Sequence, residues 1–177
     1  MNKTVKEKLS IYNVDRHYLD YLRKIDYRIP EEHDDSQISR PFVGLVLMVS
    51  GVKYIIPLSS PKKKHIHMNN SNDFMKIDGG KLGAINFNNM FPVNDEEEVC
   101  WRLDLSKTDC MNESDKVYYT LLSKQIEWMN IEENREKIYS KAEDLRAMFF
   151  EDRMPKKLRD RCCDFAKLEE ECNNYRL

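Results

Sequence analysis

The chain has 177 residues, a length typical of one domain with one core, and no stretch approaches the roughly 18 apolar residues that a membrane-spanning helix needs. Charged residues make up 34% of the sequence and hydrophobic residues 41%, which suits a soluble chain with much helical surface in water. The N-terminal residues MNKTVKEKLS contain no apolar segment of the kind found in secretory signals.

The net charge of −2 argues at first against a nucleic-acid partner, but the charges are unevenly distributed. Residues 36–92 hold seven basic and two acidic side chains, so this segment is five units positive and the remainder is seven units negative. An anion responds to the local field rather than to the overall sum. The segment therefore favours an anionic partner, and a solvated sheet face is the alternative.

The five cysteines show no zinc-binding spacing, and Cys162 and Cys163 are adjacent and cannot easily bridge each other. We interpret the cysteines as reduced thiols of a cytoplasmic protein, several of them packed in the core.

The first half of the chain predicts strands and one early helix. Residues 9–15 predict a short strand, after which Asp15 is expected to cap a helix that ends before Pro30. The clearest hairpin is predicted by the apolar runs 42–50 and 52–58, with Gly51 between them. Further strands are predicted at 74–77, 83–93 and 101–105, separated by turns at 78–80 and 94–98.

From residue 114 the apolar period changes to that of helices. Ser114 is expected to cap a helix whose apolar stripe is Val117, Leu121, Leu122, Ile126 and Met129. A second helix has its stripe at Ile138, Ala142, Leu145 and Phe149, and a third, after Pro155, at Leu158, Cys162, Phe165, Leu168 and Cys172. The fold class is therefore predicted as α+β, with a small antiparallel sheet and a helical C-terminal half.

The stretch PLSSPKKKH, residues 57–65, places a small basic loop directly after the apolar hairpin. Residues 59–62 match the S-x-x-K acyl-enzyme signature, but no K-T-G follows, so this match is weak. A metal nuclease would need clustered carboxylates, for which Asp73, Asp78 and the acidic run 95–98 are candidates without diagnostic spacing.

RNA cleavage without a metal does not need clustered carboxylates. It needs an oriented 2′-hydroxyl, stabilised phosphoryl oxygens and a route for protons. Ser60, Lys62 and His65 could supply these functions from one loop, with Arg40 at the start of the neighbouring strand.

The order of several motifs resembles a known family. These motifs are D-x-R-I-P, PFVGLVL, G-x-K-Y-x-x-P-L-S-S-P-K-x-K-H and GAINFNNMFPV, followed by YYTLLSKQIEWM and CDFAKLEEE. Together they span residues 9–172 and resemble the toxins of type III toxin–antitoxin systems, the endoribonucleases of the ToxN, CptN and AbiQ group.

This resemblance implies a single toxin domain over residues 1–177, with 1–9 as an N-terminal extension, and a compact twisted antiparallel sheet flanked by helices, distantly like Kid and MazF. It implies a metal-independent endoribonuclease without a cofactor that leaves 2′,3′-cyclic phosphate and 5′-hydroxyl ends on cellular or phage RNA. A repeated pseudoknot RNA antitoxin would inhibit it in a protein–RNA ring, and the role would be growth arrest in abortive infection. Neither a membrane nor DNA is implied as a partner.

The resemblance also carries over to individual residues. Ser60 and Lys62 match the catalytic serine and lysine, and Tyr18 matches a helix tyrosine that lines the active-site groove. Contacts to RNA are expected from Arg40, Lys53, Ser59, Lys63, Lys64, His65, Ser123 and Gln125. The loop 31–39 departs from some relatives because it lacks a tyrosine, which puts its contribution in doubt.

Alternative interpretations remain open at this point. Tyr18 at helical spacing also fits a core aromatic, and Lys63 and Lys64 also fit solubilising charges. For the whole chain, the alternatives to a ribonuclease are a non-catalytic binder of a folded small RNA and a protein-interaction domain that uses its acidic helices.

Overall fold

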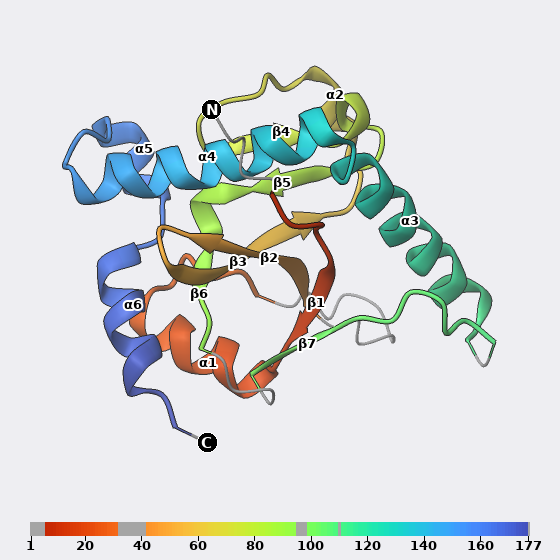
Figure 1. Ribbon diagram of the computed structural model, residues 1–177, viewed down its shortest axis with the longest axis horizontal. Coiled ribbons are helices and arrows are strands. Elements are labelled where there is room, and N and C mark those ends of the chain that lie inside the picture. The colour runs from red at the N-terminus through yellow and green to blue at the C-terminus, as the bar shows by residue number, and fades with distance from the viewer. Residues whose placement is uncertain (1–5, 32–41, 95–98, 110, 177) are drawn as a thin grey trace.

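The computed structural model describes residues 6–31, 42–94, 99–109 and 111–176 (Figure 1). Its strands form an antiparallel sheet in the order β4-β5-β3-β2-β1-β7, and β6 pairs with β3 beside this path. The strands are β1 Ile11–Val14, β2 Val43–Val49, β3 Val52–Ser59, β4 Phe74–Lys76, β5 Ala84–Asn86, β6 Phe91–Pro92 and β7 Cys100–Arg102. The helices are α1 Arg16–Ile25, α2 Lys63–His67, α3 Glu113–Met129, α4 Glu132–Phe150, α5 Lys156–Arg161 and α6 Phe165–Asn174, with 3₁₀ turns η1 Asp78–Gly80 and η2 Phe87–Asn89. The expected α+β class is confirmed.

The predicted hairpin is the centre of the sheet. Strands β2 and β3 pair from Gly44 opposite Pro57 to Val49 opposite Val52. The two turn residues, Ser50 and Gly51, have φ angles of 49° and 80°. Positive φ at both central residues gives a turn whose twist matches that of the strands. The far end of β3 then leads directly into the basic stretch.

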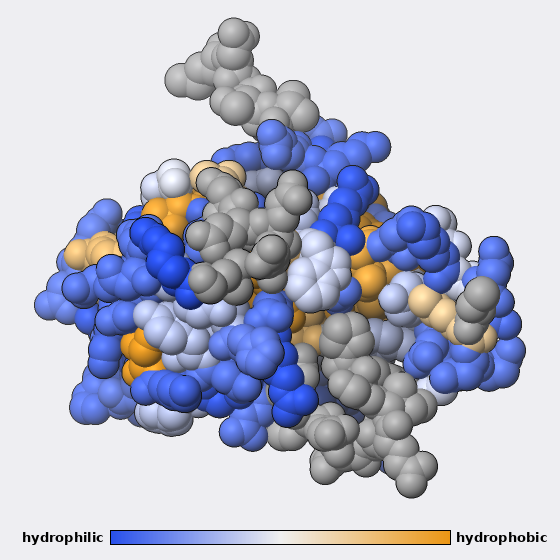
Figure 2. All heavy atoms as spheres, turned by 90° about the horizontal axis from the view of Figure 1, so that it is seen from below, coloured by the Kyte–Doolittle hydropathy of each residue, from blue (hydrophilic) through white to orange (hydrophobic). Residues whose placement is uncertain are grey.

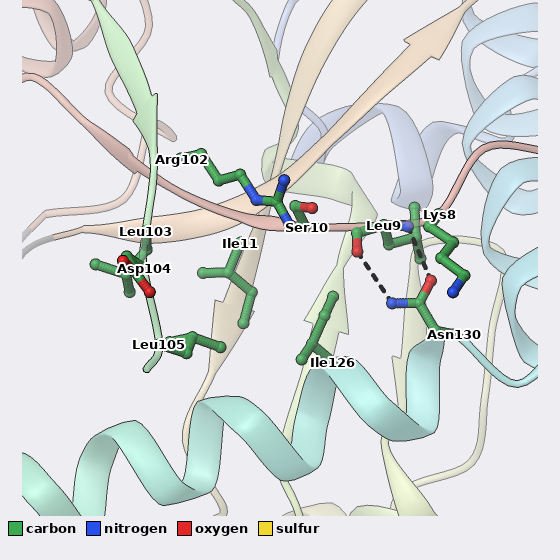
Figure 3. A pocket seen from close by; sticks show the side chains of 10 residues that line it. All are labelled: Lys8, Leu9, Ser10, Ile11, Arg102, Leu103, Asp104, Leu105, Ile126 and Asn130. Carbon is green, nitrogen blue, oxygen red and sulfur yellow. Dashed lines mark hydrogen bonds between the residues drawn. The ribbon is translucent and has the colours of Figure 1, made fainter. Parts of the chain in front are cut away.

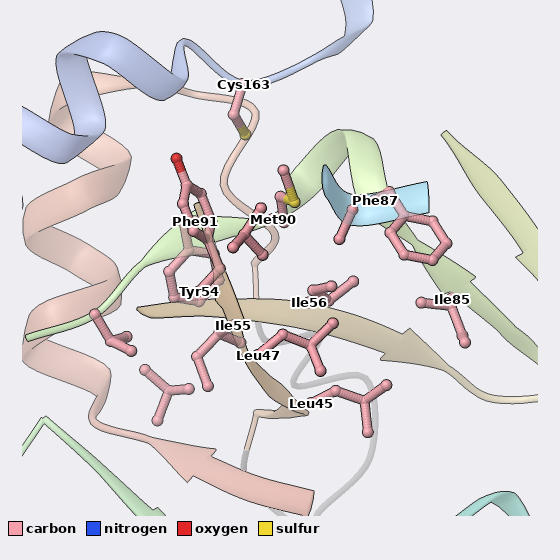
Figure 4. Close-up of a cluster of buried hydrophobic side chains, with 14 of the residues drawn as sticks. Leu45, Leu47, Tyr54, Ile55, Ile56, Ile85, Phe87, Met90, Phe91 and Cys163 are labelled. Atoms are coloured by element: carbon pink, nitrogen blue, oxygen red, sulfur yellow. The ribbon is translucent and has the colours of Figure 1, made fainter. Parts of the chain in front are cut away.

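Both faces of the central sheet are covered. Successive side chains of a strand point to opposite faces, and Tyr54, Ile55 and Ile56 of β3 are all fully buried. In Figure 1, α4 crosses above the sheet, while α1 and α6 lie side by side below it. Figure 4 shows Leu45 and Leu47 of β2 in the same cluster as Phe87, Met90 and Phe91. The sheet is therefore a rigid base for the segments that leave its ends.

The face in Figure 2 is mainly hydrophilic, and its hydrophobic areas are small and separate. In the part of the chain that the structure describes, no helix has both the length and the apolar character needed to cross a bilayer.

The predicted strand 83–93 is divided by a turn. Strand β5 ends at Asn86, the 3₁₀ turn η2 follows, and β6 begins at Phe91. The backbone N–H groups of Phe87 and Asn88 both donate to the carbonyl of Asp73, at 2.9 and 3.4 Å. This contact replaces strand pairing and turns the three asparagines of the segment toward a pocket described below.

The predicted third helix is likewise divided, at residues 162–164. The N–H of Cys163 donates to the carbonyl of Asn88 at 2.8 Å, so this N–H is not used in a helical hydrogen bond and the helix is interrupted. Asp164 then caps α6 by accepting from the N–H of Lys167. An apolar period of 3.6 continues across this break, and the sequence pattern therefore does not reveal it.

Two smaller expectations also differ from the structure. Helix α3 begins two residues earlier than predicted, capped by Asn112 rather than Ser114, and Val117 is 69% exposed instead of lying on the buried stripe. At the end of the expected N-terminal extension, Leu9 is buried, and its backbone N–H and carbonyl both bond the side chain of Asn130, at 2.8 and 3.0 Å.

Candidate active site

The basic stretch forms a loop that is fixed at both ends. Strand β3 ends at Ser59, Ser60 and Pro61 follow, and the short helix α2 begins after Lys62. The N–H of Lys62 donates to Nδ1 of His65 at 3.3 Å, and the N–H of His65 donates back to the carbonyl of Lys62 at 2.9 Å. These two hydrogen bonds hold the backbone of Lys62 while its side chain remains exposed.

His65 is the buried anchor of this loop. Its side chain packs near Phe74, with ring centroids 5.8 Å apart, and it is 3% exposed. Burial, followed by the charges of Lys62 and Lys64, lowers the pKa of His65 below its usual value. Because Nδ1 accepts a hydrogen bond, the neutral ring carries its proton on Nε2. His65 therefore positions Lys62 and is not a cation for RNA at neutral pH.

A pocket of about 440 Å³ lies beside the loop. It joins four of the predicted residues to a polar wall from β4, η2 and α5. Its lining residues are Ser59, Lys62, Lys64, His65, Met68, Ser71, Asp73, Phe74, Asn86, Asn88, Asn89 and Arg161. Ser60 and Lys63 do not line this pocket, although both are exposed on the adjoining loop.

Arg161 is a cation of this pocket that sequence reasoning missed. Its Nε and Nη2 donate to the two carboxylate oxygens of Asp73 at 2.5 and 2.9 Å, and Ser71 donates to the same carboxylate at 2.8 Å. Burial alone would raise the pKa of Asp73, but these hydrogen bonds hold it below its usual value. The Asp73 side chain is 6% exposed and that of Arg161 is 50% exposed, so the pair presents its positive end to solvent.

The asparagines of η2 were also missed. The side-chain amide of Asn88 donates to the carbonyl of Arg161 at 3.2 Å, and that of Asn89 donates to the carbonyl of Arg28 at 2.8 Å. The sequence signal for this wall is three asparagines within four residues, which favour turns over strands.

Tyr18 lies away from this pocket, in the core. It is 0% exposed, its hydroxyl donates to the carbonyl of Pro92 at 2.7 Å, and its ring meets Tyr175 edge-on at 4.9 Å between centroids. Burial raises the pKa of its phenol. The expected groove position is therefore not what the structure shows, and the core interpretation of Tyr18 fits.

The other predicted RNA contacts are dispersed. Lys53 lies at the opposite end of β3 from Ser59, about 20 Å away at the usual rise of a strand. Gln125 is buried behind the loop, where its amide donates to the carbonyl of Leu82 at 2.6 Å. Ser123 is half-buried on α3, and Arg40 lies outside the described residues, as does most of the loop 31–39.

A larger cavity, of about 560 Å³, lies between β1, β7 and α3 (Figure 3). Its floor is apolar, with Leu9, Ile11, Leu103, Leu105 and Ile126 among the lining residues, and none of the predicted site residues reaches it. Its lining also includes the cations Lys8 and Arg102. We favour the pocket beside the basic loop because four of the predicted site residues line it and none lines this cavity.

The pocket beside the basic loop offers cationic side chains, hydroxyls and amides. Among the described residues, no group of three or more His, Cys, Asp or Glu side chains is placed to hold a metal ion. An antiparallel sheet whose central hairpin ends in a fixed basic loop beside a polar pocket is the kind of site that suits an anionic ligand such as RNA.

Comparison with known proteins identifies the family. Residues 10–173 match the family model of the toxin ToxN of type III toxin–antitoxin systems. The chain belongs to this family, which confirms the expected family and the expected enzyme class, an endoribonuclease.

Individual relatives cover nearly the whole chain. It is 31% identical to the endoribonuclease ToxN of Bacillus thuringiensis subsp. kurstaki, over 98% of this chain and 87% of the relative. It is 30% identical to the endoribonuclease ToxN of Pectobacterium atrosepticum, over 94% of each chain.

Solved structures agree with the fold. A type III toxin described as selectively inhibited by a non-coding RNA pseudoknot is 30% identical, with a TM-score of 0.74 over 96% of this chain and 98% of that one. The lactococcal anti-phage endoribonuclease AbiQ, at 23% identity and a TM-score of 0.72, shows the same fold.

Proposed function

We propose that this protein is an endoribonuclease toxin that cuts RNA by attack of a 2′-hydroxyl on the adjacent phosphate, and that a folded small RNA inhibits it. The observation that carries the proposal is the fixed position of Lys62. Its backbone is held by His65, while its exposed side chain lines a pocket that also contains Lys64 and Arg161. The names of the relatives support the same activity.

In this mechanism the cations act on charge that builds up during the reaction. Negative charge grows on the phosphoryl oxygens as the 2′-oxygen attacks, and a fixed ammonium group stabilises that charge more strongly than the ground state. Lys62 has this role. The hydroxyl of Ser60, two positions before Lys62 on the exposed loop, donates to the phosphate or passes a proton.

Two adjacent lysines provide the test. Lys62 lines the pocket and Lys63 does not, although both are exposed on the same loop. Lys62→Ala should slow cleavage by about 100-fold or more, as for the loss of one fixed charge-stabilising group, with RNA affinity little changed. Lys63→Ala should retain the cleavage rate at saturating RNA. Equal cleavage rates for the two variants would contradict the assignment of Lys62.

The proposal extends to the partners and the location of the protein. The antitoxin is a folded repeat RNA, of the pseudoknot kind described for the solved relative, and the substrates are cellular or phage RNA. Alternating protein and RNA close into a ring if one toxin contacts RNA through two surfaces. The cytoplasm is the proposed location, and the buried thiols of Cys162 and Cys163 suit its reducing conditions.

A non-catalytic RNA binder is the second candidate, because the same basic loop would hold a folded RNA without cutting it. Purified protein would then bind RNA tightly at low salt and leave it intact over long incubation. Scission that disappears in Lys62→Ala would exclude this candidate.

A further inference from the structure

The turn after α1 presents an aromatic side chain to water. Residues 26–29 form a turn closed by a hydrogen bond from the N–H of Ile29 to the carbonyl of Asp26, at 3.1 Å. Ile29 is 1% exposed and anchors the turn in the core, while Tyr27 is 81% exposed. Tyr27 is therefore displayed on a fixed backbone.

The next residue, Arg28, is held in place by the same turn. The carboxylate of Asp26, which is buried, accepts from Nε and Nη2 of Arg28 at 2.8 and 2.9 Å. It also accepts from the backbone N–H groups of Arg28 and Asp164, at 3.0 and 2.7 Å. The guanidinium lies 5.6 Å from the centre of the Tyr27 ring. Four hydrogen bonds to one carboxylate make this a preorganised arrangement.

A second fixed guanidinium faces the same space. Arg159 lies over the ring of Phe149, 3.8 Å from its centre, and donates to the Phe149 carbonyl at 3.0 Å. Tyr27, Arg28, Phe149 and Arg159 line a pocket of about 450 Å³, together with Asp160, Cys162 and Asp164.

This pocket shares a wall with the candidate active site. Asn89 lines the catalytic pocket and donates to the carbonyl of Arg28, which lines the second pocket. Arg161 lines the first pocket and Cys162 the second. An RNA strand that leaves the catalytic pocket on this side would therefore meet the second pocket, which Tyr27 lines.

We infer that Tyr27, Arg28 and Arg159 form a subsite for an unpaired RNA base that flanks the cleaved bond. The inference rests on the proposed ribonuclease function. Single-stranded RNA is held by stacking its bases on aromatic rings and on guanidinium planes, and both kinds of surface are present here in fixed positions.

The lining suits a base better than a phosphate. Arg28 is paired with Asp26, and the charges of Arg159 and Lys156 are matched by those of Asp160 and Asp164, so the pocket as a whole is not a cationic trap. Asp160 already pairs with Lys156 at 2.8 Å, and Asp164 caps α6. The Tyr27 ring and the guanidinium planes offer flat surfaces for the face of a base. The guanidinium N–H groups and the nearby carboxylates offer donors and acceptors for its edge.

The test uses a short oligoribonucleotide whose cleavage site has been mapped and whose cleavage is blocked by a 2′-O-methyl group at that site. A series of variants of this RNA carries one abasic nucleotide each, at successive positions on either side of the site. In the unmodified protein, one abasic position should weaken binding about 5- to 150-fold, the range for losing one base–aromatic stack. Tyr27→Ala should weaken binding of the complete RNA similarly and make that abasic position harmless. Tyr27→Phe should behave as the unmodified protein.

The matched control is Trp101→Ala, which removes another exposed aromatic, on β7, that lines neither of the two pockets. It should leave the abasic profile unchanged. If Tyr27→Ala retains the abasic sensitivity of the unmodified protein while RNA is still bound and cleaved, the subsite is refuted and the ribonuclease proposal stands. If the unmodified protein neither binds nor cuts any RNA, both proposals fail.

Discussion

Lys62 owes its position to His65, and the link between them depends on the protonation state of the imidazole. Nδ1 of His65 accepts a hydrogen bond from the N–H of Lys62, and this contact is lost if Nδ1 takes up a proton. Burial and the neighbouring lysines lower the pKa of His65 and keep the ring neutral near pH 7. The loop is therefore built from a buried neutral base and exposed cations.

This arrangement predicts a pH-dependent stability. The unfolded chain gains a proton on His65 near pH 6.5 and the folded protein only at lower pH, so the contribution of His65 is complete above about pH 6.5 and lost as the pH falls. The slope from this group is at most about 1.4 kcal/mol per pH unit. Urea unfolding between pH 5 and 8 measures it, with His65→Asn as the comparison. An equally steep loss of stability in His65→Asn would contradict this role.

Two variants can separate the effect of Arg161 on protein stability from its effect on the rate of RNA cleavage. Arg161→Gln should destabilise the fold by about 1–3 kcal/mol, because it leaves the buried Asp73 carboxylate with fewer partners. It should also slow cleavage about 10-fold or more through the lost cation of the pocket. Adding Asp73→Asn should restore most of the stability but not the cleavage rate. Recovery of cleavage in the double variant would show that Arg161 acts only on folding.

At the scale of elements, the end of β3 is the joint between the sheet and the catalytic loop. Strand β5 contacts it there, with Ser59 opposite Ala84. A Cβ on Gly83 would lie 2.0 Å from the Ser59 carbonyl oxygen, whereas a Cβ on Gly79 would meet nothing within 4 Å. Both glycines have positive φ, 63° at Gly79 and 106° at Gly83, so a side chain at Gly83 would add backbone strain to this contact.

The two glycines therefore form a matched pair of tests. Gly79→Ala should cost about 1–2 kcal/mol from backbone conformation alone. Gly83→Ala should cost several kcal/mol more and lower cleavage, since the end of β3 must shift. Urea unfolding and initial cleavage rates measure both effects. Equal unfolding free energies for the two variants would contradict the close approach of β5 to β3.

The regular elements could be predicted from sequence, because local periodicity and caps determine them. The hairpin of β2 and β3 and the Asp15 cap of α1 are confirmed. The break at Cys163 could not be predicted, because it depends on a backbone hydrogen bond to Asn88, 75 positions earlier in the chain. The break at Phe87–Asn89 had a local signal in its asparagines, but the hydrogen bonds to Asp73 that fix it are not visible in the sequence. The polar wall of the pocket, including Arg161, comes from these breaks and was missed for the same reason.

At the scale of the molecule, Lys62, Lys64 and Arg161 line the pocket where RNA is expected to bind, whereas Lys53 lies at the far end of β3. Protein–phosphate contacts release counterions, so RNA affinity should fall steeply with salt. The double reversal Lys63→Glu/Lys64→Glu should weaken binding and flatten the salt dependence without unfolding the chain. Lys107→Glu/Lys167→Glu makes the same charge change at exposed positions away from the loop and is the control. Equal losses in both double variants would mean that only overall charge matters.

Assembly with RNA is expected if one toxin contacts RNA through two surfaces. We expect equimolar protein and antitoxin RNA in a closed particle, and protein alone as a monomer or weak dimer. Light scattering before and after ribonuclease treatment measures this. A protein oligomer that survives removal of the RNA would contradict RNA-dependent assembly.

The central claim is that the fixed basic loop cleaves RNA without a metal, and the chemistry of the RNA ends in excess EDTA tests it most directly. The unmodified protein should leave 2′,3′-cyclic phosphate and 5′-hydroxyl ends at the same rate with and without the chelator, and Lys62→Ala should leave almost none. Loss of cleavage in EDTA that magnesium restores would contradict the mechanism, as would an unchanged rate in Lys62→Ala.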